Sequence, residues 1–236
     1  MYLDSKQQID VFDDEDDYDY EDPVGPEMTA RERAEGFIRT AVLFESALAF
    51  VAVGLGWLVG VAPWISTSWD TGTAAAIFAS IGTGALATLP LLAAFMWLQY
   101  AEIDSLNELQ EFMDRQIVPL FREATLLELG LISLAAGLGE EALFRGVIQT
   151  YLQQLMGADA GPAVPILLTS LLFGVVHYVS REYFIITAIM GAYLGIWFYY
   201  TGDIIVPIVI HTLYDWFALA YLKKMAPEME AESDEA

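Results

Sequence analysis

Two adjacent carboxylates and an arginine, Glu140, Glu141 and Arg145, lie inside a long apolar run, Leu126 to Leu155. A charge at the centre of a membrane helix costs roughly 2.5–3.5 kcal/mol on insertion scales, so such residues are kept where they face a protein interior or a wet cavity and have a function. In a helix, Glu141 and Arg145 share a face and can pair. Glu140 points about 100° away from Glu141, because a helix has 3.6 residues per turn. The spacing therefore predicts one neutralised glutamate, Glu141, and one available glutamate, Glu140.

The two histidines of the chain also lie in apolar segments. His177 follows Phe173 by four residues and His211 precedes Asp215 by four, so in helices each pair shares a face. A carboxylate beside an imidazole fixes its tautomer and raises its basicity, which makes His211 with Asp215 the more suggestive pair. Taken alone, His177 is more simply explained as a hydrogen-bonded packing residue. Three separate hydrophobic segments nevertheless carry Glu, His, and His with Asp, a concentration of ionisable groups that packing does not explain.

The composition indicates a polytopic helical membrane protein. The 236 residues are 56% hydrophobic, and the apolar residues come in blocks too long for a soluble domain. The absence of cysteine excludes disulfides, thiol nucleophiles and thiolate metal sites. The net charge of −23 is concentrated in the tails, since residues 1–28 carry eleven acids and one lysine, and residues 226–236 carry five acids and no base. So acidic a chain is not expected to bind nucleic acid.

The elements that must position these residues are about six membrane-spanning helices in an all-α fold, since one crossing of a bilayer requires roughly 20 residues. The third is longer than one crossing needs, so it could tilt or its end could project as a polar helix. The expected spans are Phe37–Val61, Thr73–Leu98, Thr125–Leu155, Ala163–Val179, Tyr183–Tyr200 and Ile204–Leu222. Between the second and third, residues Tyr100–Arg122 place apolar side chains at three- and four-residue steps opposite an acidic face. This pattern predicts an amphipathic helix on the membrane surface, or else a water-exposed extension of a neighbouring span.

The organisation that follows is a disordered acidic tail over residues 1–28, a helical transmembrane domain over 29–225, and an acidic tail over 226–236. Thr29 with Glu32 three residues later is a capping-box pattern and predicts where the first helix begins. Glu45 falls within the first span, and we interpret it as a residue near the membrane interface rather than part of the interior.

The distribution of basic residues predicts the orientation. An even number of spans puts both termini on one side, and on this assignment nine of the ten lysines and arginines fall on that side. The tenth is Arg145, within the motif, and the three opposite loops contain neither residue type. The positive-inside rule therefore predicts an integral protein of the cell membrane with both termini in the cytoplasm. At these depths the ionisable residues of the three spans could meet in a cavity open toward the cytoplasm.

Taken in order, the three motifs resemble those of the CPBP family, which comprises the type II CAAX prenyl endopeptidases and bacteriocin-processing relatives. The motifs are Glu140-Glu141-x-x-x-Arg145, Phe173-x-x-x-His177 and His211-x-x-x-Asp215. The resemblance covers about Leu126–Leu222, the catalytic core of that family. One position departs from the pattern, because the third motif often has asparagine where this chain has Asp215.

This resemblance implies an intramembrane endopeptidase of glutamate type, without a cofactor, whose partners are the lipid bilayer and a peptide or membrane-protein substrate. A prenylated C-terminus or a leader peptide would be such a substrate. Glu140 would polarise a water as general base, assisted by His177. His211 and Asp215 would help to position or stabilise the oxyanion. Glu141 with Arg145 would shape the site.

Two alternatives remain open at this stage. Glu140, His177 and His211 could ligate a catalytic zinc ion, since two histidines and a carboxylate are a known zinc set, although the His-Glu-x-x-His signature is absent. The chain could also be a non-catalytic membrane scaffold or immunity protein that keeps the fold. A carrier that uses the carboxylates as a proton relay is a less favoured third reading.

Overall fold

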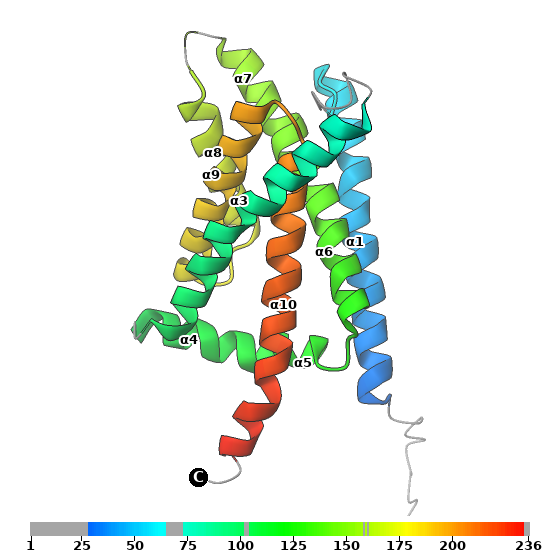
Figure 1. Ribbon diagram of the computed structural model, residues 1–236, viewed down its shortest axis with the longest axis vertical. Coiled ribbons are helices and arrows are strands. Elements are labelled where there is room, and N and C mark those ends of the chain that lie inside the picture. The colour runs from blue at the N-terminus through cyan, green and yellow to red at the C-terminus, as the bar shows by residue number, and fades with distance from the viewer. Residues whose placement is uncertain (1–27, 65–72, 102–103, 158, 160, 234–236) are drawn as a thin grey trace, which may run out of the picture.

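The computed structural model describes residues 28–64, 73–101, 104–157, 159 and 161–233. The predicted acidic tail, residues 1–28, lies outside the described residues except for Met28. The described part is an elongated bundle of helices (Figure 1). The helices are α1 (Ala30–Val59), α3 (Ala74–Tyr100), α4 (Asp104–Phe112), the π-helix η1 (Met113–Ile117), α5 (Val118–Phe121), α6 (Leu126–Glu141), the π-helix η2 (Ala142–Gln149), α7 (Thr150–Met156), α8 (Ala163–Val176), α9 (Arg181–Thr201) and α10 (Ile205–Ser233).

The helices confirm the predicted all-α membrane protein. Among the described residues, four segments are long and apolar enough to cross a membrane: Ala30–Val59, Ala74–Tyr100, Arg181–Thr201 and Ile205–Met225. The other two expected spans take a different form. The third is divided by η2 into α6 and α7, and the fourth, α8, has only 14 residues. Large hydrophobic side chains on the outer surface remain exposed, such as Phe50 at 79% and Trp57 at 82%, as a bilayer environment requires.

Two capping boxes start the helices α1 and α6 side by side. Thr29 and Glu32 form the predicted box at α1, and Thr125 and Glu128 form an equivalent box at α6. Arg31 joins them, because its Nη2 lies 2.7 Å from Oε1 of Glu128. Each box satisfies backbone N–H groups that the first turn of a helix leaves without partners, and the ion pair links the starts of the two helices.

The amphipathic segment lies across the bundle rather than extending a span. In Figure 1, α4 and α5 run transverse to the long helices, close to the end at which α1 begins and α10 ends. Leu106, Leu109, Val118 and Phe121 are buried on its inner side. A separate amphipathic helix is therefore present and does not continue α3, because α3 ends at Tyr100 with an extended cap at Ala101. Its location at the membrane surface stays a prediction.

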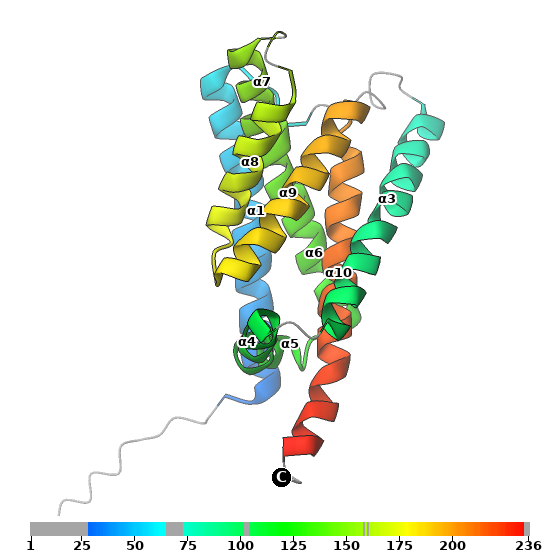
Figure 2. The ribbon, with the colours of Figure 1, turned by 90° about the vertical axis from the view of Figure 1, so that its left-hand side faces the viewer.

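Helix α6, which carries the two glutamates, packs between α1 and α10 (Figure 2). Two glycines permit this close packing. A Cβ atom on Gly139 would stand 2.1 Å from the carbonyl oxygen of Glu45 in α1, and one on Gly137 would stand 2.3 Å from Oγ1 of Thr212 in α10. Small residues at helix interfaces are the usual means of bringing backbones together in membranes. The residues next to Glu140 are thus fixed by backbone contact on both sides.

Candidate active site

Glu141 and Arg145 form a fully buried ion pair, as their spacing predicted. Oε1 of Glu141 lies 2.8 Å from Nη1 of Arg145, and both side chains are 0% exposed. Arg145 also donates from Nη2 to the carbonyl oxygen of Gly191 in α9 at 2.9 Å, and its guanidinium stacks 4.7 Å above the ring of Phe173. These contacts compensate a charge that would be costly in an apolar interior, and they connect α6, α8 and α9.

The chain widens into the π-helix η2 directly after Glu141. The side-chain hydroxyl of Thr150 donates to the carbonyl oxygen of Arg145, five residues earlier, at 3.0 Å. Gln149, fully buried, donates from Nε2 to the carbonyl oxygen of Gly195 at 3.0 Å, one turn along α9 from the contact of Arg145 with Gly191. π-Helical segments occur frequently at functional sites. Here the π-helix directly follows Glu140 and Glu141. The bonds from the side chains of Arg145 and Gln149 to α9 fix its orientation.

His211 has a carboxylate on each ring nitrogen. Its Nδ1 lies 2.8 Å from Oε1 of Glu141, and its Nε2 lies 3.3 Å from Oδ2 of Asp215. The residue is only 3% exposed. The predicted pairing of His211 with Asp215 is present, and the contact with Glu141 was not predicted. A carboxylate at each nitrogen favours the protonated imidazolium, which can donate from both nitrogens.

Glu140 faces His177 across the site. Oε2 of Glu140 lies 3.5 Å from Nε2 of His177, while Nδ1 of His177 is 2.8 Å from the carbonyl oxygen of Phe173. A carbonyl oxygen only accepts, so Nδ1 carries a hydrogen and the Nε2 edge is directed toward Glu140. Oε2 of Glu140 is buried and has no hydrogen-bond partner among the described residues. Oε2 of Glu141 is buried without a partner as well, but Oε1 of Glu141 is held by Arg145 and His211 at 2.8 Å each. Glu140 is therefore the less constrained carboxylate of the two.

Phe173 packs between the two histidines. Its ring centroid is 4.4 Å from that of His177 and 6.0 Å from that of His211, and its edge-to-face contact with Phe144 spans 5.0 Å. Only 1% of Phe173 is exposed. The aromatic residue of the second motif is thus a buried spacer that sets the separation of the imidazoles.

Glu45 belongs to the interior of the site, so its interpretation as an interfacial residue is wrong. It lies in the middle of α1, opposite Gly139, and its Oε2 is buried without a hydrogen-bond partner among the described residues. The charged groups that it interacts with are Glu140, His177, His211 and Asp215. The expected span began at Phe37, which placed Glu45 near the start of the helix. The helix in fact begins at Ala30, so Glu45 lies in its middle.

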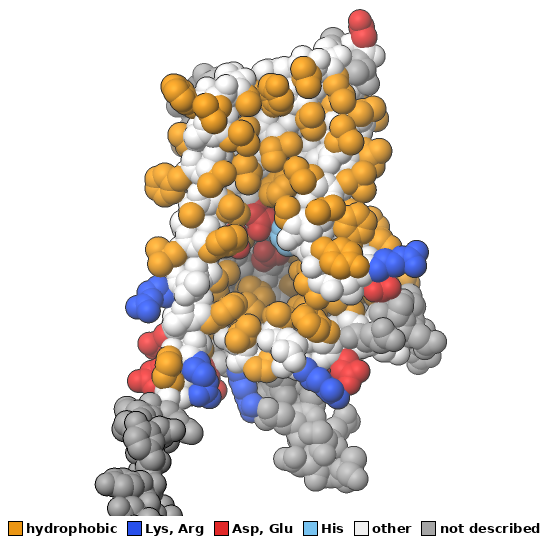
Figure 3. Space-filling model, turned by 180° about the vertical axis from the view of Figure 1, so that it is seen from behind, with side chains coloured by type: hydrophobic (Ala, Val, Ile, Leu, Met, Phe, Trp, Pro, Cys, Tyr) orange, Lys and Arg blue, Asp and Glu red, His pale blue; other side chains and the backbone are white. Residues whose placement is uncertain are grey.

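The site is open on one side of the bundle. Seen from behind, the surface is hollowed, and acidic and histidine side chains are visible inside the hollow between apolar walls (Figure 3). The side chains of His177 and Asp215 are 27% and 30% exposed, whereas that of Glu140 is 8% exposed. In this view the Lys and Arg side chains gather toward the end at which α1 begins.

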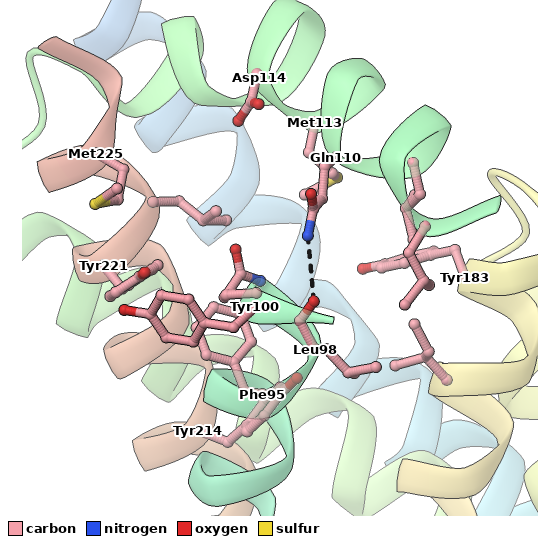
Figure 4. A pocket seen from close by; sticks show the side chains of 15 residues that line it. Phe95, Leu98, Tyr100, Gln110, Met113, Asp114, Tyr183, Tyr214, Tyr221 and Met225 are labelled. Carbon is pink, nitrogen blue, oxygen red and sulfur yellow. Dashed lines mark hydrogen bonds between the residues drawn. The ribbon is translucent and has the colours of Figure 1, made fainter. Parts of the chain in front are cut away.

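An apolar pocket of about 290 Å³ lies beside the site, between α3, the segment formed by α4 and η1, α9 and α10 (Figure 4). Its walls include Phe95, Tyr100, Met113 and Tyr221, and Gln110 closes one side by donating to the carbonyl oxygen of Leu98 at 3.2 Å. Two further wall residues connect the pocket to the site. Tyr214 precedes Asp215 in α10, and Tyr183 interacts electrostatically with Asp215 and Glu140.

The donor set does not fit the zinc site that was the alternative. Within the described residues, no group of three or more His, Asp or Glu side chains is arranged to hold a metal ion. Both nitrogens of His211 are directed at carboxylates, so neither is presented to an ion shared with Glu140 and His177. A zinc ligand needs one imidazole nitrogen for the metal.

The fold and site thus define an all-α integral membrane protein with a buried glutamate and histidine centre. Residues 122–217 match the family model of the Rce1-like type II CAAX prenyl endopeptidases. The match includes all six predicted site residues and confirms the resemblance found in the motifs, so this segment of the chain is similar to the CAAX prenyl endopeptidases. Searches of the curated proteins and of the solved structures found no match.

Proposed function

We propose that this chain is an intramembrane endopeptidase of glutamate type, in which Glu140 activates the attacking water. The observation that carries the proposal is the division of labour between the two glutamates. Each glutamate keeps a buried Oε2 without a hydrogen-bond partner among the described residues. Oε1 of Glu141 is however committed to both Arg145 and His211 at 2.8 Å, whereas the ion contact given for Glu140 is the longer one with His177, at 3.5 Å. A general base must be unoccupied and within hydrogen-bond reach of the proton that it removes.

His177 would hold the same water. Its Nε2 and Oε2 of Glu140 are 3.5 Å apart, so one water at ordinary hydrogen-bond distance can contact both atoms. The bond from Nδ1 to Phe173 orients the ring for this contact. Glu140 takes the proton of the water, and the hydroxide that forms adds to the scissile carbonyl carbon.

His211 would then stabilise the oxyanion. Of its two contacts, that with Asp215 is longer, at 3.3 Å, than that with Glu141, at 2.8 Å. The Nε2–H group is therefore the more weakly held of the two donors, and it is the one that could bond to a developing negative charge. Donors preorganised in a water-poor site contribute strongly to acyl-transfer catalysis. Asp215 and Glu141 keep the imidazole oriented.

The substrate that we propose is a membrane-associated peptide with an apolar group, such as a prenylated C-terminus. The matched family is described as type II CAAX prenyl endopeptidases. The pocket beside the site supports this substrate, since it is lined mostly by aromatic and aliphatic side chains and approaches Asp215 through Tyr214. A leader peptide with a hydrophobic segment is the alternative substrate of the same chemistry.

The location that we propose is the cell membrane, with residues 29–225 as the protease domain between two acidic tails and both termini in the cytoplasm. The basic side chains near the end at which α1 begins support this orientation (Figure 3).

The experiment that tests the function is hydrolysis of a prenylated CAAX-type peptide and of the same peptide without the lipid, by purified protein in detergent. We expect the wild type to cleave the prenylated peptide preferentially. Glu140→Gln should abolish cleavage while the protein remains folded. Glu35→Gln is the matched control, because Glu35 lies on the same helix as Glu45 but pairs with Arg31 at the exposed end of α1. Turnover at the wild-type rate by Glu140→Gln would refute the proposal.

A further inference from the structure

We infer that Glu45 of α1 is a second catalytic carboxyl group, which donates the proton to the leaving amine when the peptide bond breaks. The inference rests on the proposed glutamate mechanism and adds a residue from outside the segment that matches the family model, which begins at residue 122.

The placement of Glu45 is fixed by the backbone. Its carbonyl oxygen would stand 2.1 Å from a Cβ on Gly139, the residue before Glu140, and the side chain of Leu48 would be 3.1 Å away from the same atom. Helices α1 and α6 are therefore in van der Waals contact at this level. Because no side chain on Gly139 separates the helices, Glu45 is held at the level of Glu140, with which its carboxyl group interacts electrostatically.

The contacts of Glu45 do not explain it as a structural residue. An acidic residue that stabilises a membrane bundle is usually paired with a base or bonded to several donors. Arg145 is instead committed to Glu141 and to Gly191, and Oε2 of Glu45 is buried without a partner in the part of the chain that the structure describes.

The charged groups that interact electrostatically with Glu45 come from three elements. They are Glu140 on α6, His177 at the end of α8, and His211 and Asp215 on α10. All four are residues of the proposed catalytic site. Two carboxyl groups that face one site hold a single proton between them more readily than two negative charges, as in the aspartic proteases. If Glu140 is ionised to act as the base, the shared proton resides on Glu45.

The reaction then balances without a further reactant. Glu140 takes one proton from water, the hydroxide adds to the carbonyl carbon, and the electron pair of the C=O bond moves to the oxygen. The C–N bond then breaks as the C=O bond re-forms, and Glu45 delivers its proton to the departing nitrogen. The products are a carboxylic acid and an amine. Transfer of the proton from Glu140 to Glu45 through a water restores the starting state.

The test compares two probes that differ in the need for this proton. One is a fluorogenic prenylated CAAX-type peptide, and the other is the same peptide with a thioester in place of the scissile amide. A thiolate leaves without protonation near neutral pH, because its conjugate acid has a pKa of about 8.5, whereas an amine leaves only when protonated. The variants are Glu45→Gln, Glu140→Gln and the control Glu35→Gln, each assayed for kcat/KM on both probes.

We expect Glu45→Gln to lose about 100-fold or more on the amide, the lower end of the contribution of general acid catalysis. On the thioester it should stay within about threefold of the wild type, which also shows that the variant is folded. Glu140→Gln should lose activity on both probes, and Glu35→Gln on neither.

Other results would overturn the inference. Equal activity of Glu45→Gln and wild type on the amide would show that Glu140 delivers the proton itself. Equal losses on both probes would show that Glu45 has a structural or binding role. If only the Glu45 result fails while Glu140→Gln is inactive, the proposed function stands without this residue. If the wild type hydrolyses neither probe, or Glu140→Gln hydrolyses both, the proposed function fails and the inference with it.

Discussion

The carboxylate of Glu141 lies 2.8 Å from Nδ1 of His211, a contact that joins α6 to α10 across 70 positions of sequence. The same oxygen atom of Glu141 accepts from Arg145. One carboxylate oxygen thus orients the arginine of the first motif and the histidine of the third. The contact indicates why two adjacent glutamates occur, since Oε1 of Glu141 is used in holding the arginine and the histidine of the site.

Removing either partner of the buried ion pair between Glu141 and Arg145 should cost stability as well as activity. Glu141→Gln and Arg145→Ala each leave a buried charge uncompensated, and breaking a buried ion pair in this way costs about 3–5 kcal/mol. Thermal unfolding in detergent, followed by circular dichroism, should show a clear decrease in melting temperature for both variants. Glu140→Gln is the matched control and should melt near the wild type, because the contact of Glu140 with His177 is longer, at 3.5 Å, and involves no arginine. Wild-type stability of Glu141→Gln would contradict this account.

The packing of α1 on α6 predicts that Gly139→Ala is inactive. A Cβ at this position would stand 2.1 Å from the carbonyl oxygen of Glu45, so the two helices must separate and Glu140 must move. Gly82→Ala in α3 is the matched control, because nothing lies within 4 Å of the Cβ that it adds. That control should gain up to about 1 kcal/mol from helix propensity. The measurements are peptide turnover and thermal unfolding, and full activity of Gly139→Ala would refute the close approach.

Much of this arrangement could be predicted from the sequence because its causes are local. The spacing of Glu141 and Arg145 places them on one helix face wherever the helix runs, and the apolar blocks reveal the spans. The pairing of His211 with Asp215 follows in the same way. Each of these predictions depends on residues within one helix.

What the sequence could not predict depends on contacts between helices. Gln149 is a polar residue of a type usually found on surfaces. It is buried here because Gly195 has no side chain to occupy the space beside it on α9, and its Nε2 donates to the Gly195 carbonyl oxygen. Glu45 is an isolated acid in an apolar run, and only the close approach of Gly139 places it in the site. The signal that could have found Glu45 is the same cost argument that identified Glu140, applied to the middle of the first span.

Chelation should leave the activity unchanged. His211 directs both nitrogens at carboxylates, so the proposed site residues are not arranged as a zinc site. Protein dialysed against a strong chelator should cleave the prenylated peptide at its original rate and contain no stoichiometric zinc by atomic emission. Activity that is lost on chelation and restored by zinc would instead favour metal chemistry.

The orientation can be tested with reporters. Fusions after residue 28 and after Lys224 should report from the cytoplasm, because α1 begins and α10 ends at the same end of the bundle (Figure 1). An insertion near Asp159, in the connection between α7 and α8 at the opposite end, should report from the outside. The inverted pattern would place the basic end outside and contradict the positive-inside assignment.

The last prediction concerns Asp215, where many CPBP sequences carry asparagine. Its contact with Nε2 of His211 is 3.3 Å, and its side chain is 30% exposed, so we expect an orienting role rather than a buried charge essential to the fold. Asparagine offers a carbonyl oxygen to the same nitrogen, whereas alanine offers none. Asp215→Asn should therefore keep turnover within about tenfold of the wild type, and Asp215→Ala should lose about 100-fold, in the range of a positioned catalytic group.

The measurement is kcat/KM on the prenylated peptide from pH 5 to 9 for all three proteins, with thermal unfolding in parallel. Folded protein is expected in each case, because Glu141 still holds Nδ1 of His211 at 2.8 Å. An asparagine variant as inactive as the alanine variant would show that the negative charge of Asp215 is required. In that event the imidazolium of His211 needs both carboxylates, and stabilisation of the oxyanion by its Nε2–H group, as proposed above, would have to be abandoned.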